Sequence, residues 1–202
     1  MNLFLWILQA LLGLAFIAPG LLKTFQPKEK LAPKMPWVND FSPGVVKFVG
    51  WLKAIGFDEV TMTTNGYLLE ENLEGLVEAG LDRINISLDT LQPEKFAFIT
   101  RRNHFQKVWD AIMAALETPL SPVKINAVAM RGVNDDEIAD MAKLTLEYPM
   151  HVRFIELMPL NGDTDGSRFR SLFISGKEIL ERAQEELGDL TEIEPDDPAA
   201  PA

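Results

Sequence analysis

The sequence contains no cysteine and only two histidines among its 202 residues. The absence of cysteine excludes disulfides, thiolate zinc sites and iron–sulfur clusters held by thiolates of this chain. The two histidines, His104 and His151, lack the spacing of metal ligands, so we expect no metal site. Basic residues are also few, with 19 lysines and arginines against 30 acidic residues and a net charge of −11. Nucleic-acid binding requires a basic surface, so we expect no nucleic-acid partner.

The negative charge is unevenly distributed along the chain. Residues 1–50 hold five lysines and two acidic residues, a net charge of +3, which leaves −14 for residues 51–202. A change of sign within one chain suggests two different environments. The total length suffices for one domain of ordinary size, or for a small domain with an appendage.

A long uncharged run, LFLWILQALLGLAFIAPGLL, occupies residues 3–22. As a helix it spans about 30 Å, the thickness of a bilayer core. A secretory signal peptide fits less well because no basic residue precedes the run, and a buried soluble helix is rarely this long. We expect a membrane helix here. The lysines that follow would place the acidic remainder in the cytoplasm, and the whole chain is cytoplasmic if the helix does not insert.

The residues LWILQALLGLAFIAPGLLK and QPKEKLAPKMPWVNDFSPGVVKFVG resemble the beginning of the DoxX family of small membrane proteins. That family continues through several more membrane helices. Residues 42–50, SPGVVKFVG, would open the second helix, and the resemblance ends inside that element. It covers about a quarter of the chain, residues 1–50.

Beyond residue 51 the pattern is that of alternating strands and helices. Strand-like runs occupy residues 59–65, 83–90, 122–130 and 151–157, and amphipathic helical segments occupy residues 68–80, 105–117, 134–147 and 175–188. Gly80 and Gly188 are suited to end helices, and the pairs Asn134/Glu137 and Ser175/Glu178 have capping-box spacing. This order predicts βα units on a parallel sheet. Residues 189–202 are acidic and proline-rich, so we expect a loose tail.

Polar side chains gather where these strands end, which is where parallel α/β folds carry their chemistry. Lys124 is the most informative, because a lysine between Val123 and Ile125 in a central strand needs an anion or another polar partner. Structural interpretations remain open: Glu156 could pair with Lys124 or Arg153, and Met158 could fill the core. Thr64, Asn65 and Asp89 could be turn or cap residues. The strand-end set comprises Thr63, Thr64, Asn65, Ser87, Asp89, Lys124, Asn126, Glu156 and Met158.

The segments TTNGYLLEENLEGLVEAGLDRINISLDTL, PVKINAVAMRGVNDDEIADM and VRFIELMPLN together resemble the MoaA family. These are radical S-adenosylmethionine (SAM) GTP cyclases of molybdenum-cofactor biosynthesis. The resemblance implies an α/β fold, a partial TIM-like (βα) barrel with about four of the family's six units, preceded here by the hydrophobic helix. It implies that Thr63 and Lys124 contact GTP. It likewise implies that Ser87 and Met158 contact SAM.

The family's cysteine-bearing regions have no counterpart in this chain. The resemblance implies a [4Fe–4S] cluster, which cannot be built here without cysteine. We therefore expect a partial GTP cyclase with no catalytic residues of its own that is inactive alone. The expected divisions are residues 1–50, 51–188 and 189–202. Because both resemblances break off inside an element, we hypothesise a chimera of two fragments, and a membrane-anchored, non-enzymatic protein is the alternative function.

Overall fold

The computed structural model describes residues 41–159 and 167–192. The chain divides into two compact units, residues 1–44 and 45–202, and the sheet with the helices that follow α3 belongs to the second unit. The membrane helix expected at residues 3–22 lies outside the described residues. Within the described ranges no helix is both long and apolar enough to cross a bilayer.

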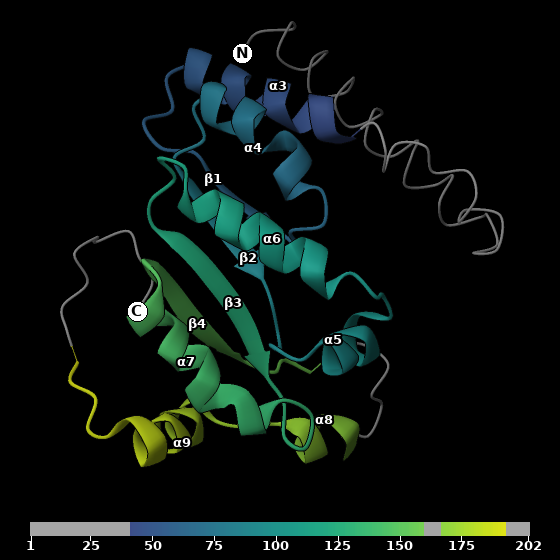
Figure 1. The fold of residues 1–202 in the computed structure, drawn as a ribbon, viewed down its shortest axis with the longest axis vertical. Coiled ribbons are helices and arrows are strands. Elements are labelled where there is room, and N and C mark those ends of the chain that lie inside the picture. The colour runs from purple at the N-terminus through teal and green to yellow at the C-terminus, as the bar shows by residue number, and fades with distance from the viewer. Residues whose placement is uncertain (1–40, 160–166, 193–202) are drawn as a thin grey trace, which may run out of the picture. The chain divides into compact units, whose positions relative to one another are not determined.

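The described elements alternate between strands and helices, as the sequence pattern predicts (Figure 1). The strands expected at 59–65, 83–90, 122–130 and 151–157 are all present. The first begins two residues later and ends one residue earlier than expected, and the second ends three residues earlier. The elements are α3 (Phe41–Ala54), β1 (Thr61–Thr64), α4 (Leu69–Glu78), β2 (Arg83–Ser87), α5 (Pro93–Thr100), α6 (Phe105–Leu116), β3 (Val123–Ala129), the 3-10 helix η3 (Asp135–Glu137), α7 (Ile138–Glu147), β4 (Met150–Glu156), α8 (Ser167–Leu172) and α9 (Gly176–Leu187).

The four strands form one sheet in the order β1-β2-β3-β4, and every neighbouring pair is parallel. This confirms the parallel α/β class. In the described part of the chain β1 pairs only with β2, and β4 pairs only with β3, so the sheet has two free edges. The expected partial barrel is supported to that extent: four consecutive βα units are present, and the described strands do not close.

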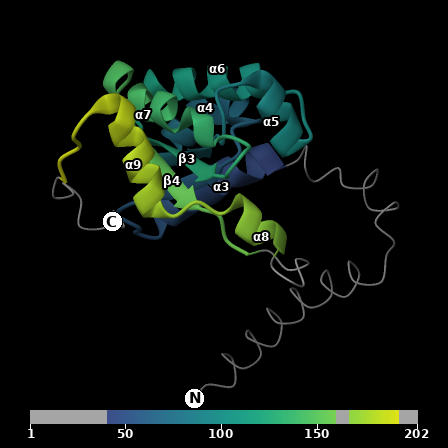
Figure 2. The same cartoon turned by 90° about the horizontal axis from the view of Figure 1, so that it is seen from below.

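The two faces of the sheet differ in chemistry because successive side chains of a strand point to opposite sides. Ile84, Ile86 and Ile125 lie on one face and are completely buried. Helices α4, α6 and α7 lie along this apolar side, as Figure 2 shows. The residues that alternate with these isoleucines are polar and belong to the other face.

Helix α3 joins the two parts of the sequence that resemble different families. It runs from Phe41 to Ala54 without a break, and Val49 is 3% exposed in the core of the α/β unit. At its end, Lys53 forms an ion pair with Asp82 at 2.9 Å, and Asp82 also accepts a hydrogen bond from the backbone nitrogen of Val60. Residues 45–50, which resemble the DoxX family, are thus packed into the α/β unit.

The predicted helix ends are confirmed in part. Gly80 and Gly188 both have positive φ; Gly188 directly follows α9, and Gly80 follows the C-cap residue Ala79 of α4. Ser175 caps α9 by accepting a hydrogen bond from the nitrogen of Glu178. The capping box expected at Asn134 and Glu137 is wrong. The Asn134 side chain instead accepts a hydrogen bond from the nitrogen of Met130, and the Glu137 carboxylate accepts one from the hydroxyl of Thr90. Asn134 and Glu137 make these bonds because they are buried against the ends of β2 and β3.

Candidate functional site: the polar face of the sheet

A row of polar side chains crosses the sheet at its middle. Strand register places Thr63 beside Asn85, Asn85 beside Lys124, and Lys124 beside His151. The side-chain nitrogen of Asn85 donates to the hydroxyl of Thr63 at 3.3 Å. The two residues proposed from sequence for GTP, Thr63 and Lys124, therefore share one face, with Asn85 between them.

A second row lies two residues further toward the ends of the strands. Register places Ser87 beside Asn126 and Asn126 beside Arg153. The side-chain oxygen of Asn126 is buried and has no hydrogen-bond partner among the described residues. A buried polar atom without a partner is costly, and such an atom in a native structure needs an explanation. A ligand that donates a hydrogen bond beside Ser87 would supply the missing partner.

Two cations on this face lack an anion. Lys124 is 8% exposed and Arg153 is half-buried, and in the described ranges neither side chain forms an ion pair or a hydrogen bond. Most other lysines and arginines of the unit do have carboxylate partners, such as Lys107 with Glu71. In a chain of net charge −11, cations kept away from carboxylates favour an anionic ligand.

Glu156 does not pair with Lys124 or Arg153, contrary to the structural interpretation that the sequence left open. Glu156 lies three residues beyond Arg153 in β4, so the two side chains point to opposite faces of the sheet. The Glu156 carboxylate instead accepts a hydrogen bond from the backbone nitrogen of Gly176 at the start of α9. Lys124 is therefore left without the partner that would have made it purely structural.

Met158 lies two residues beyond the end of β4, at the same end of the sheet as Ser87. Its side chain is 69% exposed, so it does not fill the core. An exposed thioether at the carboxyl end of a strand offers an apolar contact for a ligand placed there.

Thr64, Asn65 and Asp89 hold the backbone, as the alternative interpretation predicts. Thr64 accepts from the nitrogen of Gly66, and Asn65 accepts from the nitrogen of Tyr67. Asp89 accepts from the nitrogen of Val128 at 2.9 Å, and burial of the Asp89 carboxyl raises its pKa despite that bond. These residues shape the loops at the strand ends.

Sequence reasoning assigned no role to Asn85, and it did not predict that Arg153 lies on the same face of the sheet as Lys124. The signal was available in the strand pattern: both residues are polar at positions that alternate with apolar residues in β2 and β4. What the pattern could not supply is the register, which decides that Asn85 stands between Thr63 and Lys124.

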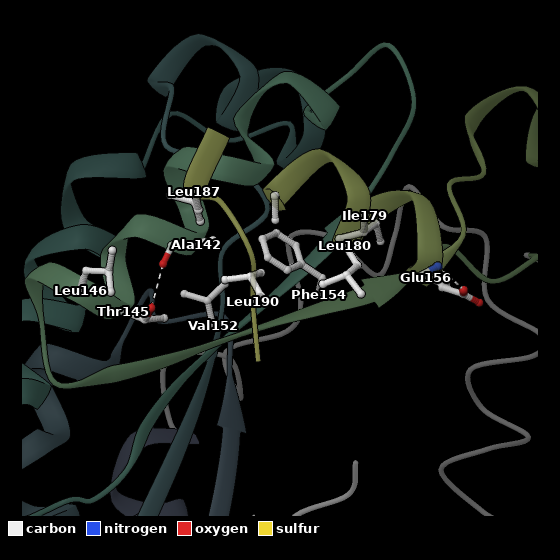
Figure 3. A pocket seen from close by; sticks show the side chains of 12 residues that line it. Ala142, Thr145, Leu146, Val152, Phe154, Glu156, Ile179, Leu180, Leu187 and Leu190 are labelled. Atoms are coloured by element: carbon white, nitrogen blue, oxygen red, sulfur yellow. Dashed lines mark hydrogen bonds between the residues drawn. The ribbon is translucent and has the colours of Figure 1, made fainter. Parts of the chain in front are cut away.

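A groove of about 500 Å³ lies elsewhere, between α7, α9 and β4 (Figure 3). Among the residues that line it, Glu156 is the one charged side chain, and the rest are mostly aliphatic. The groove takes in Val152 and Phe154 of β4, which alternate with Arg153, so it belongs to the apolar face. It contains none of the GTP- or SAM-binding residues proposed from sequence.

Two family models match the chain. The model of the radical SAM superfamily matches residues 38–145, which is more than half of the chain. A model of a DoxX-like family matches residues 7–58. The two matches overlap over residues 38–58, a range that contains α3.

The curated relatives include several proteins named GTP 3′,8-cyclase. The one from Heliobacterium modesticaldum is 51% identical over 150 residues, 72% of this chain and 45% of that protein. The one from Peptoclostridium acidaminophilum is 40% identical over 188 residues, 92% of this chain and 55% of that protein. The chain thus spans about half the length of these relatives. A solved structure of TYW1 with a lysine-pyruvate adduct bound aligns with a TM-score of 0.45 and 17% identity, over 71% of this chain and 46% of that one.

Proposed function

The chain belongs to the radical SAM superfamily, and we propose that the polar face of its sheet is a partial GTP 3′,8-cyclase site that binds nucleotide without turning it over alone. The observation that carries this proposal is Lys124, a buried lysine in a central strand whose charge has no partner among the described residues. A ligand phosphate would supply the missing anion.

GTP is the proposed ligand of the first polar row. Lys124 would contact its phosphates, and Thr63, held by Asn85, would offer a hydroxyl on the same face. Arg153 lies one row away and would add a second cation for the phosphate groups. The names of the relatives are consistent with this choice of nucleotide.

SAM is the proposed ligand of the second row. Asn126 has a buried acceptor without a partner among the described residues, and Ser87 beside it is exposed, so the pair fits the polar groups of a nucleoside. Met158 would pack on the same ligand at the end of β4. When bound in an intact enzyme of this superfamily, SAM supplies the radical. In this chain the residues above would bind and orient it.

An iron–sulfur cluster does not fit the residues of this chain. The sequence has no cysteine, and the described residues contain no group of three side chains able to hold a metal ion. No reaction step therefore runs through a cluster held by this chain, and we propose binding without catalysis unless another polypeptide supplies the missing groups.

Isothermal titration calorimetry on the full chain tests the proposal. We expect GTP to bind, and we expect Lys124→Ala to weaken GTP affinity at least tenfold while leaving SAM affinity within twofold. Ser87→Ala should show the reverse selectivity. Lys177→Ala is the matched control, because Lys177 is exposed on α9, away from the polar face. Equal GTP affinity in Lys124→Ala and in the unsubstituted chain would refute the assignment.

A second candidate is a membrane-attached protein without enzymatic activity, favoured by the DoxX-like match over residues 7–58. Residues 3–22 would then insert, and the acidic unit would remain on the cytoplasmic side. Cell fractionation separates the candidates. Recovery of the full chain in carbonate-washed membranes supports this one, and recovery in the soluble fraction contradicts it.

A further inference from the structure

An aromatic surface lies on helix α3 and the turn that follows it. Phe48, Trp51, Ile55 and Phe57 are each more than half exposed. The rings of Phe48 and Trp51 stack with centroids 5.9 Å apart, and Ile55 follows Trp51 by one helical turn. We call these four residues the α3 surface. Large apolar side chains gathered on a surface mark a site of interaction.

The opposite side of α3 is already packed. Val46 approaches Gly75 of α4, Gly50 approaches Ala79, and Lys53 pairs with Asp82. The α3 surface is therefore the side of the helix that faces away from α4. It is not a stretch of core opened by a poorly packed helix.

Strand β1 follows α3 and has a free edge. The carbonyl oxygen of Val60 accepts from the nitrogen of Asp82 at 3.0 Å, so the backbone groups of Val60 face β2. Successive residues of a strand direct their backbone N–H and C=O groups to alternate edges. The backbone groups of Thr61 and Thr63 therefore face away from β2, toward the edge where the described residues provide no strand. Parallel strands are seldom left at an uncovered edge.

These two features have one explanation. In a right-handed crossover, the helix before a parallel strand packs over that strand and over the one that precedes it. Helix α3 precedes β1, but in the described ranges no preceding strand is paired with β1. We propose that the free edge of β1 and the α3 surface together bind a strand–helix segment of a second polypeptide, which adds a strand parallel to β1. The inference rests on the proposed function for its choice of partner class, a segment of a radical SAM protein.

Other occupants fit less well. A bilayer would leave the backbone groups of Thr61 and Thr63 unsatisfied beside the inserted side chains. A second copy could offer the edge of β4, but that arrangement is head-to-tail and would continue into an open-ended assembly unless a ring closed. A separate segment satisfies both the edge and the apolar surface. The Heliobacterium modesticaldum relative, of which this chain spans 45%, has enough additional length to contain one.

The test mixes the full chain with the parts of the Heliobacterium modesticaldum relative that lie outside its 150-residue match to this chain. We expect a 1:1 complex by analytical ultracentrifugation and a blue shift of tryptophan emission that is absent in Trp51→Phe. Trp51→Glu and Thr61→Pro should each weaken the complex at least tenfold, since proline removes a donor from the free edge. The matched controls, Leu146→Glu on another exposed apolar position and Thr61→Val, should stay within twofold.

Several outcomes would overturn the inference. One is that no complex forms. Another is that Trp51→Glu and the unsubstituted chain bind the added segment with equal affinity. If the chain self-associates or binds phosphatidylcholine–phosphatidylglycerol vesicles, and Trp51→Glu abolishes that binding, the α3 surface has another occupant. Protection of Trp51 from acrylamide in the free chain would show that the chain covers the surface itself. If Thr61→Pro does not fold by circular dichroism, Trp51→Glu carries the test, because Trp51 is exposed. The complex is tested without nucleotide, so a failure to form it can be distinguished from a failure of the chain to bind GTP.

Discussion

The side-chain amide of Asn85 donates a hydrogen bond to the hydroxyl of Thr63 across β1 and β2, at 3.3 Å between Nδ2 and Oγ1. The same asparagine stands beside Lys124 in the register of β2 and β3. Asn85 therefore lies between the two residues proposed to bind GTP, and orients one of them before any ligand arrives.

Replacing Asn85 by alanine should weaken GTP binding. One neutral hydrogen bond contributes about 0.5–1.5 kcal/mol, so we expect a loss of affinity of roughly two- to twelvefold by calorimetry. The control is Gln106→Ala, which removes an amide from the exposed pair with Asp110 on α6. If both variants bind GTP equally well, Asn85 does not position Thr63 for the nucleotide.

Replacing Lys124 by methionine should stabilise the chain while removing its affinity for GTP. The Lys124 side chain is 8% exposed and no anion lies beside it among the described residues, whereas methionine fills a similar volume without a charge. We expect the free energy of unfolding to rise by about 1–3 kcal/mol in urea titrations. A fall of similar size would mean that Lys124 has a stabilising partner in solution.

The carboxyl of Glu178 should make stability depend on pH under acid conditions. Hydrogen bonds from Arg131, at 2.6 and 2.8 Å, and from Arg182 lower its pKa from 4.5 to about 2. A carboxyl whose pKa is lower in the folded than in the unfolded chain stabilises the fold at pH values above its unfolded pKa. The contribution of Glu178 to stability is therefore complete above pH 4.5 and is lost as the pH falls toward 2.

Thermal melts between pH 2 and pH 6 check this expectation. Glu178→Gln should flatten the fall of melting temperature in that window relative to the unsubstituted chain. Glu185→Gln, on the same helix but with no ion pair among the described residues, should leave the slope unchanged. Parallel pH profiles for all three chains would contradict a role for the Arg131–Glu178–Arg182 cluster in acid stability.

Val49 tests whether the DoxX-like part of α3 belongs to the folded α/β unit. Its side chain is 3% exposed in the core cluster, and Val49→Ala removes two methylene equivalents, so we expect a loss of about 1–2 kcal/mol in the free energy of unfolding. Lys47→Ala, at an exposed position of the same helix, should change stability by less than about 0.5 kcal/mol. Equal effects would place α3 outside the cooperative unit.

The local pattern of the sequence was sufficient to predict the strands and the parallel class, whereas the GTP and SAM residues were assigned through the family resemblance and stay predictions. Period-two alternation around Ile84 and Ile86 marks a strand, and a lysine between Val123 and Ile125 indicates a partner that the core cannot provide. The absence of cysteine by itself excludes a cluster held by this chain. These conclusions depend on residue type and short spacing, both of which are present in the sequence.

Tertiary structure decided what depends on register and on packing between distant segments. Asn85 acquires its position only because β1, β2 and β3 align at Thr63, Asn85 and Lys124. Glu156 is kept from Arg153 by the alternation of β4 and meets Gly176 instead, and the expected capping box at Asn134 gives way to contacts with the ends of other strands. Val49 belongs to the α/β core because α4 lies beside α3. Sequence patterns fix which residues are apolar or polar, whereas the partners of each are set by long-range pairing that short spacings do not contain.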